Sequence, residues 1–163
     1  MNRTPFSIKL VILILLFLNC NKSDITSVIP KIEYLGMSKF EMKQGDLNQD
    51  TLLLQFNFED GDGDLGFGTN STRADIFVKD SRTGNLQDSF KLPDLPPSQN
   101  DPQKGSITIL VFTTCCLFPD GTPPCENPVK YPVDSLQYLI TIKDKAGNES
   151  NIIHSAFVKL LCQ

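Results

Sequence analysis

Apolar and polar residues alternate with a period of two at several places along this chain of 163 residues. Residues 50–59 show the pattern most clearly, because every second residue from 52 to 58 is a leucine or a phenylalanine. No stretch of helical length has a convincing 3.6-residue period, so the sequence predicts an all-β fold. Strands are expected over residues 28–35, 50–59, 73–80, 106–114, 134–143 and 150–161.

The expected strands are short and closely spaced, which is typical of an antiparallel β-sandwich. Pro30 suits an edge strand in residues 28–35, because proline cannot donate a hydrogen bond to a neighbouring strand. Residues 106–114 are apolar on both faces and are therefore expected at the centre of a sheet. Most of the prolines lie in two expected loops, over residues 91–104 and 115–132.

The first 20 residues, MNRTPFSIKLVILILLFLNC, have the layout of a secretory signal. The positive residues Arg3 and Lys9 precede an apolar run over residues 10–18. This run is shorter than the roughly 20 residues that a membrane-spanning helix needs. The alternatives are an ordinary signal peptide that is cut elsewhere and an uncleaved anchor.

Residues 17–20, Phe-Leu-Asn-Cys, resemble the lipobox of bacterial lipoproteins, in which a peptidase cuts before the cysteine and the thiol is diacylated. They depart from it at Asn19, where a small residue is usual. The resemblance implies attachment to a membrane through Cys20, and the lack of an acidic residue directly after Cys20 implies an outer-membrane lipoprotein, facing the periplasm or the surface. It divides the chain into a signal peptide (residues 1–19), a lipidated cysteine with a polar tether (20–27) and a folded domain (28–163).

Five cysteines are an odd number for a secreted protein, and using Cys20 for lipid leaves four. Four cysteines allow two disulfides in three pairings, of which a bridge between the adjacent Cys115 and Cys116 would be strained. Structural disulfides are favoured because the chain has neither a C-x-x-C redox motif nor the spacing of a zinc knuckle. The candidates for the two disulfides are Cys115, Cys116, Cys125 and Cys162.

Residues 134–140, Asp-Ser-Leu-Gln-Tyr-Leu-Ile, resemble the D-x-A-x-Y-x-C signature that opens strand F of immunoglobulin-like domains. In that family the tyrosine, here Tyr138, forms a tyrosine corner by bonding to upstream backbone, whereas the cysteine position is here Ile140. Residues 144–148, Asp-Lys-Ala-Gly-Asn, resemble a hairpin between strands F and G of bacterial immunoglobulin-like and fibronectin-III-like domains. Together they imply an immunoglobulin-like (fibronectin-III-like) antiparallel β-sandwich of about seven strands.

The sequence DGDGDLG, residues 60–66, is the one stretch suited to metal chemistry. Asp60, Asp62 and Asp64 repel one another unless a cation lies among them, and oxygen ligands on a glycine-rich backbone suit Ca²⁺. An EF-hand is excluded because its glycine and glutamate positions are not matched and no helices are expected. A polar turn without a metal is the alternative. Residues 58–66 also resemble a pattern in small bacterial lipoproteins of unassigned function, in which a strand is followed by F-x-D-G-D-G-D-L-G.

The immunoglobulin-like topology implies which loops meet. Loops 60–73 and 144–149 would lie at the same end of the sandwich, so Asp144 and Asn148 would complete a Ca²⁺ shell begun by the three aspartates.

The same topology implies the pairing of the cysteines. The strands that end near residues 115–116 and at Cys162 both run to the opposite end of the sandwich. Adjacent residues on a strand point in opposite directions, so one of Cys115 and Cys116 is expected to pair with Cys162 and the other with Cys125.

The composition and the motifs argue against some classes of function. The net charge of −4 argues against a nucleic-acid partner. His154 is the only histidine and belongs to no motif, and no motif of a hydrolase or a phosphate-binding loop is present, so the sequence predicts that the protein is not an enzyme. The expected function is a binding, adhesion or assembly module with a structural Ca²⁺ site and an unknown protein or glycan partner. A carbohydrate-binding module, weakened by the absence of Trp, and a Ca²⁺-dependent hydrolase are the alternatives.

Overall fold

The computed structural model describes residues 27–96 and 102–163. The described part of the chain is all-β and contains no helix, as the alternating pattern predicts; accordingly, no helix there is long and apolar enough to cross a membrane. The predicted signal peptide, Cys20 and all but the last residue of the tether lie outside the described residues. The strands are β1 (Lys31–Met37), β2 (Glu41–Lys43), β3 (Thr51–Asp60), β4 (Ile76–Asp80), β5 (Leu86–Phe90), β6 (Gln103–Phe112), β7 (Val133–Leu136), β8 (Tyr138–Ile142), β9 (Ile153–His154) and β10 (Val158–Leu161).

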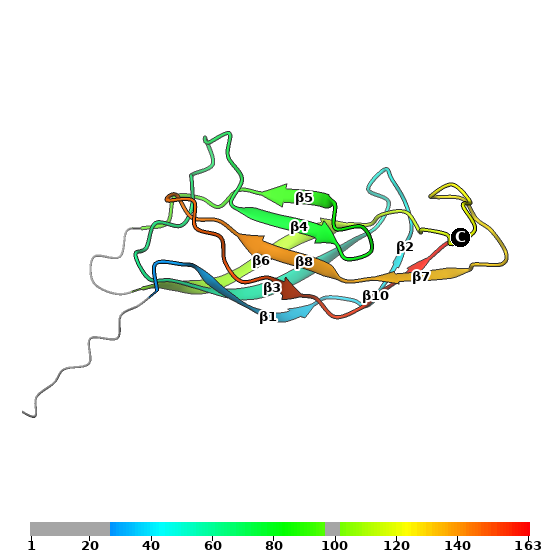
Figure 1. Cartoon of the computed structure of the whole chain (residues 1–163), viewed down its shortest axis with the longest axis horizontal. Coiled ribbons are helices and arrows are strands. Elements are labelled where there is room, and N and C mark those ends of the chain that lie inside the picture. Colours follow the sequence, from blue (N-terminus) through cyan, green and yellow to red (C-terminus); the bar gives the residue numbers. More distant parts are fainter. Residues whose placement is uncertain (1–26, 97–101) are drawn as a thin grey trace, which may run out of the picture.

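The strands form one sheet in the order β1-β3-β6 and two further sheets in the orders β5-β4-β8-β9 and β2-β10-β7. All pairs are antiparallel except the short pairing of β2 with β10. One continuous core joins the inner faces of the three sheets, with Phe56 of β3 and Val111 of β6 buried in the same cluster as Val78 of β4 and Ile140 of β8. The arrangement fits a β-sandwich, whose strands run along the length of the molecule with loops at both ends (Figure 1).

The predicted edge strand is confirmed, since β1 follows Pro30 directly and pairs with β3 alone among the described strands. The predicted central position of residues 106–114 is wrong, because β6 is also at the edge of its three-stranded sheet. Its second apolar row faces outward: Leu110 is 43% exposed and lies opposite Leu53, which is 45% exposed. An apolar residue on both faces therefore does not prove burial on both faces.

Each of the two C-terminal strands predicted from alternation is broken into two strands that belong to different sheets. Gln137 separates β7 from β8, and residues 155–157 separate β9 from β10. The two breaks lie against each other, because the Ser155 hydroxyl accepts a hydrogen bond from the Tyr138 amide (2.9 Å) and the Gln137 side chain donates to the Ser155 carbonyl (2.7 Å). Two side chains thus replace part of the backbone hydrogen bonding where the two neighbouring segments change sheets.

Tyr138 is fully buried, and burial is the main reason that its pKa rises to about 12. Its hydroxyl donates a long hydrogen bond (3.5 Å) to the Phe112 carbonyl and lies 3.7 Å from the sulfur of Met42. The hydroxyl thus bonds to backbone upstream of Tyr138, as in a tyrosine corner. That backbone belongs to β6, which lies in another sheet. Tyr138 therefore links the sheets across the core.

Two disulfides lie at the end of the sandwich that holds the C-terminus (Figure 1). Cys115 pairs with Cys125 and Cys116 pairs with Cys162, which confirms the pairing scheme implied by the topology. Cys116 and Cys162 are both buried in the core. The C-terminal strand is therefore covalently fixed to the segment that follows β6.

Removing the two disulfides separately is expected to give unequal losses of stability. The Cys116–Cys162 bridge links residues 46 apart, whereas the Cys115–Cys125 bridge links residues 10 apart. Because loop-closure entropy grows with loop length, replacing both Cys116 and Cys162 with alanine should cost about 1 kcal/mol more than the same change at the other pair. Urea unfolding of both double variants measures this, and equal losses would contradict it.

Candidate metal centre

Two loops at the opposite end of the molecule from the disulfides bring four carboxylates together (Figure 1). The loop between β3 and β4 begins directly after Asp60, and the other loop follows β8. Each of the four aspartates offers an oxygen, and these oxygens all lie within 4.8 Å of one another. Asp60 and Asp144 are buried, Asp64 is half-buried and Asp62 is exposed, so the cluster reaches from the core to the solvent. Its members are Asp60, Asp62, Asp64 and Asp144.

The alternating Asp and Gly residues form a tight turn around the first carboxylate. Oδ2 of Asp60 accepts hydrogen bonds from the amides of Asp64 (2.9 Å) and Leu65 (3.2 Å). Gly63 has a φ of 69°, in the left-handed region that disfavours side chains, and Leu65 is fully buried. The turn is thus held at one side by the Asp60 carboxylate and at the other by the core.

The second loop is organised around Asp144. Its Oδ1 accepts hydrogen bonds from the amides of Gly147 and Asn148, both at 2.7 Å. The Asn148 side-chain nitrogen donates to Oδ2 of Asp144 at 2.8 Å. The structure therefore gives Asn148 the role of orienting Asp144, and its direct coordination of a cation stays a prediction.

The two loops are bonded to each other through Asp64. Its Oδ2 accepts a hydrogen bond from the amide of Ala146 (3.0 Å), and its carbonyl accepts one from the amide of Lys145 (3.3 Å). The start of the described chain crosses the same end, because the Gly61 amide donates to the Ser27 carbonyl (3.1 Å) and Asn148 donates to the Val28 carbonyl (3.3 Å). Three separate segments meet at this cluster.

Burial and mutual repulsion disfavour the ionised form of the cluster. The pKa of Asp60 rises from 3.8 to about 6, first because it is buried and then because Asp62 and Asp64 are close. The pKa of Asp64 is also raised, by burial and by the charges of Asp144 and Asp62. Oδ1 of Asp60 and Oδ1 of Asp64 are buried and have no hydrogen-bond partner in the part of the chain that the structure describes. A cation among these oxygens would satisfy both atoms and cancel the repulsion, so the cluster has the chemistry to hold a metal ion.

Asp75 is a buried structural residue whose role the sequence pattern did not indicate. It is fully buried and accepts hydrogen bonds from the amides of Phe67 (2.8 Å) and Leu92 (2.7 Å). It thereby fixes the aspartate loop to the proline-rich segment that leads toward β6. The lone histidine, His154, is exposed on β9.

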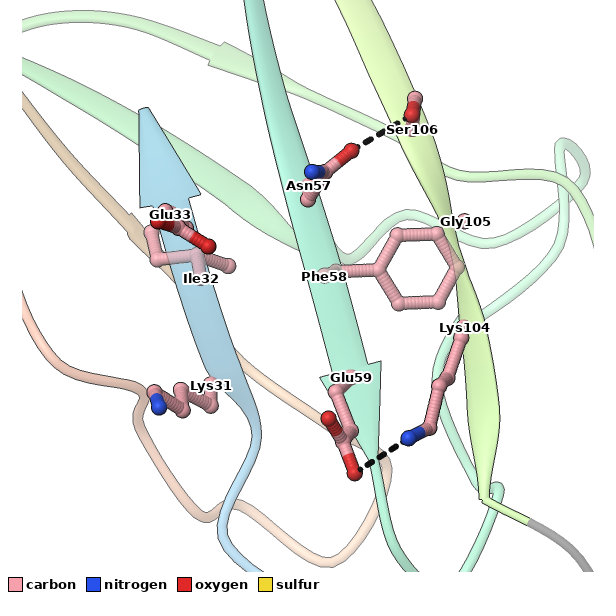
Figure 2. A pocket seen from close by; sticks show the side chains of 9 residues that line it. All are labelled: Lys31, Ile32, Glu33, Asn57, Phe58, Glu59, Lys104, Gly105 and Ser106. Atoms are coloured by element: carbon pink, nitrogen blue, oxygen red, sulfur yellow. Dashed lines mark hydrogen bonds and ion pairs between the residues drawn. The ribbon is translucent and has the colours of Figure 1, made fainter. Parts of the chain in front are cut away.

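A shallow pocket of about 400 Å³ lies on the sheet of β1, β3 and β6 (Figure 2). Figure 2 shows Phe58 projecting from β3 toward Gly105, and a side chain at residue 105 would meet the Phe58 ring at 2.9 Å. Glu59 and Lys104 form an ion pair (2.9 Å) and the Ser106 hydroxyl donates to Asn57 (2.6 Å). The polar groups of the pocket are therefore largely paired with each other.

Comparison with protein-family models, with curated proteins and with solved structures finds no match to this chain.

Proposed function

We propose that the four-aspartate cluster is a structural Ca²⁺ site that fastens the loop after β3 to the loop after β8. The observation that carries this proposal is Oδ1 of Asp60, a fully buried carboxylate oxygen beside three further carboxylates. It has no hydrogen-bond partner among the described residues. Ca²⁺ accepts six to eight oxygen ligands in flexible geometry, which suits carboxylates from two loops. Mg²⁺ demands near-ideal octahedral geometry, and Zn²⁺ favours nitrogen and sulfur ligands.

The sandwich itself is proposed to be of the immunoglobulin-like, fibronectin-III-like type. The strand orders support this assignment, since β1-β3-β6 matches a sheet of strands A, B and E, and β5-β4-β8 matches strands C′, C and F. The last segment, β9 and β10, then takes the place of strand G. In this assignment the aspartate loops are the B–C and F–G loops.

The chain as a whole is proposed to be a lipoprotein of the outer membrane, anchored by a diacylated Cys20 and carrying a non-catalytic binding, adhesion or assembly domain. Two disulfides support a location outside the cytoplasm. The partner of the domain is proposed to be a protein or a glycan. Glycan arrays probed with the full chain in detergent distinguish a glycan partner from a protein partner.

Calorimetric titration with Ca²⁺ tests the metal site. The wild-type chain is expected to bind, and Asp62→Ala is expected to weaken binding at least about tenfold, because it removes a ligand without burying or exposing core atoms. Asp46→Ala is the matched control, since Asp46 is an exposed aspartate outside the cluster. Absence of heat above background with the wild-type chain would exclude the proposed site.

A further inference from the structure

We infer that the Gln103 side-chain carbonyl is a further ligand of the same cation, supplied by the first residue of β6. This inference rests on the Ca²⁺ site proposed above and adds a neutral oxygen to its carboxylates. Gln103 is the first residue of β6, and nothing in its sequence neighbourhood resembles a metal-binding motif.

The strand register places Gln103 beside the cluster. Asp60, the last residue of β3, and Gln103 are directly opposite each other in the antiparallel pairing of β3 with β6. Side chains of directly opposed residues lie on the same face of a sheet, with their Cβ atoms about 4.5–5.5 Å apart. Both face the interior, because Asp60 is 0% and Gln103 is 8% exposed. The side-chain amide of Gln103 can therefore reach the carboxylate of Asp60.

The hydrogen bonds of Gln103 fix which end of its amide remains free. Nε2 donates to the Pro96 carbonyl at 2.9 Å, whereas Oε1 is buried and has no hydrogen-bond partner among residues 27–96 and 102–163. Turning the amide over would place Oε1 against the Pro96 carbonyl oxygen, so that two acceptors would face each other. The orientation with a free Oε1 is the one that the Pro96 carbonyl selects.

One rung of the sheet thus carries two buried, unpartnered oxygens, Oδ1 of Asp60 and Oε1 of Gln103. Two acceptors cannot satisfy each other, but a hard cation satisfies both at once. The carbonyl oxygens of Asn and Gln are ordinary Ca²⁺ ligands, and a neutral ligand raises the coordination number without adding to the repulsion among the four aspartates. The bond from Gln103 to Pro96 also connects the cation site to the proline-rich segment.

Calorimetric titration of the full chain in detergent with CaCl₂ tests this role. Gln103→Leu is expected to raise the Kd for Ca²⁺ on the order of tenfold or more, since it removes the oxygen and puts an apolar side chain of similar size in its place. Gln87→Leu is the matched control: Gln87 also donates through Nε2 to a main-chain carbonyl (Phe112, 2.9 Å) and also has a buried, unpartnered Oε1, but it lies on β5. The Kd of the Gln87→Leu variant for Ca²⁺ is expected to equal that of the wild-type chain.

A second measurement uses the wild-type chain and does not depend on the folding of a variant. Saturating Ca²⁺ is expected to shift the ¹³Cδ resonance of Gln103, whose carbonyl would coordinate the ion, and to leave that of Gln87 in place. If the wild-type chain binds Ca²⁺ but Gln103→Leu binds equally tightly, or the Gln103 resonance does not move, the role of Gln103 is refuted and the aspartate site stands. If the wild-type chain does not bind, the aspartate site itself is refuted.

Discussion

Replacement of Arg82 with methionine is expected to lower the free energy of unfolding by about 3–5 kcal/mol, because it leaves two acidic groups without their largely buried partner. The Arg82 side chain is 12% exposed and bonds to Asp80 and to Asp134, each at 2.5 Å. Burial alone would lower the pKa of Arg82, but the hydrogen bonds and charges of the two aspartates outweigh it and raise the pKa. Asp134 also accepts a hydrogen bond from the Leu117 amide (2.9 Å), so the network reaches the disulfide-bonded segment.

Urea unfolding at neutral pH measures the effect of Arg82→Met. Lys159→Met is the matched control, because it removes an ion pair with Glu41 in which both side chains are about half exposed, and it should cost less than about 1 kcal/mol. A loss at Arg82 as small as the loss at Lys159 would show that the buried network contributes little.

In the presence of a calcium chelator, the free energy of unfolding is expected to fall as the pH rises from about 4 to about 7. The pKa of Asp60 is about 6 in the folded chain and 3.8 as its ordinary value, so between these values the folded state binds more protons than the unfolded state. Stability falls with rising pH wherever the folded state binds more protons. The contribution of protonated Asp60 is therefore present at low pH and lost as the pH passes 6.

Saturating Ca²⁺ is expected to reverse this trend, because the cation binds the ionised carboxylates and competes with protons. At neutral pH a Ca²⁺ concentration of 100 times Kd should add about 2.7 kcal/mol. Urea unfolding at pH 4.5 and pH 7, with EGTA or with CaCl₂, measures both effects. Asp60→Asn is the control, since it should remove most of the pH dependence seen in EGTA. Stability that rises with pH in EGTA would contradict the electrostatic description of the cluster.

Sequence patterns predicted the inner faces of the strands well, because alternation depends only on the two-residue period of an extended chain. They could not predict where the segments change sheets, since Leu136 and Tyr138 are both buried on either side of the break and the alternation continues through it. The sequence patterns also failed to predict the position of β6 in its sheet, because residue type alone does not distinguish the exposed Leu110 from a buried leucine.

The aspartates of the cluster were predictable because three of them are clustered along the chain and the fourth lies in a recognisable hairpin. Asp75 and Gln103 were not, although both are buried polar residues at the same end of the molecule. A single polar residue at the start of a strand, or directly before it, forms no sequence pattern of its own. Its role depends on strand register and on the neighbouring loop, which only the three-dimensional structure defines.

In a chain anchored through Cys20 as proposed, a mechanical pull would enter the domain where Gly61 bonds to Ser27 and Asn148 bonds to Val28. A pull on the residues before Ser27 reaches the two aspartate loops first, whereas the far end is closed by covalent bridges at Cys116 and Cys162. Under such a pull, the end held by hydrogen bonds and by the proposed cation would give way before the end held by disulfides. For a chain that is anchored through Cys20 and holds Ca²⁺ as proposed, the concentration of calcium would then set the load at which this end of the domain begins to open.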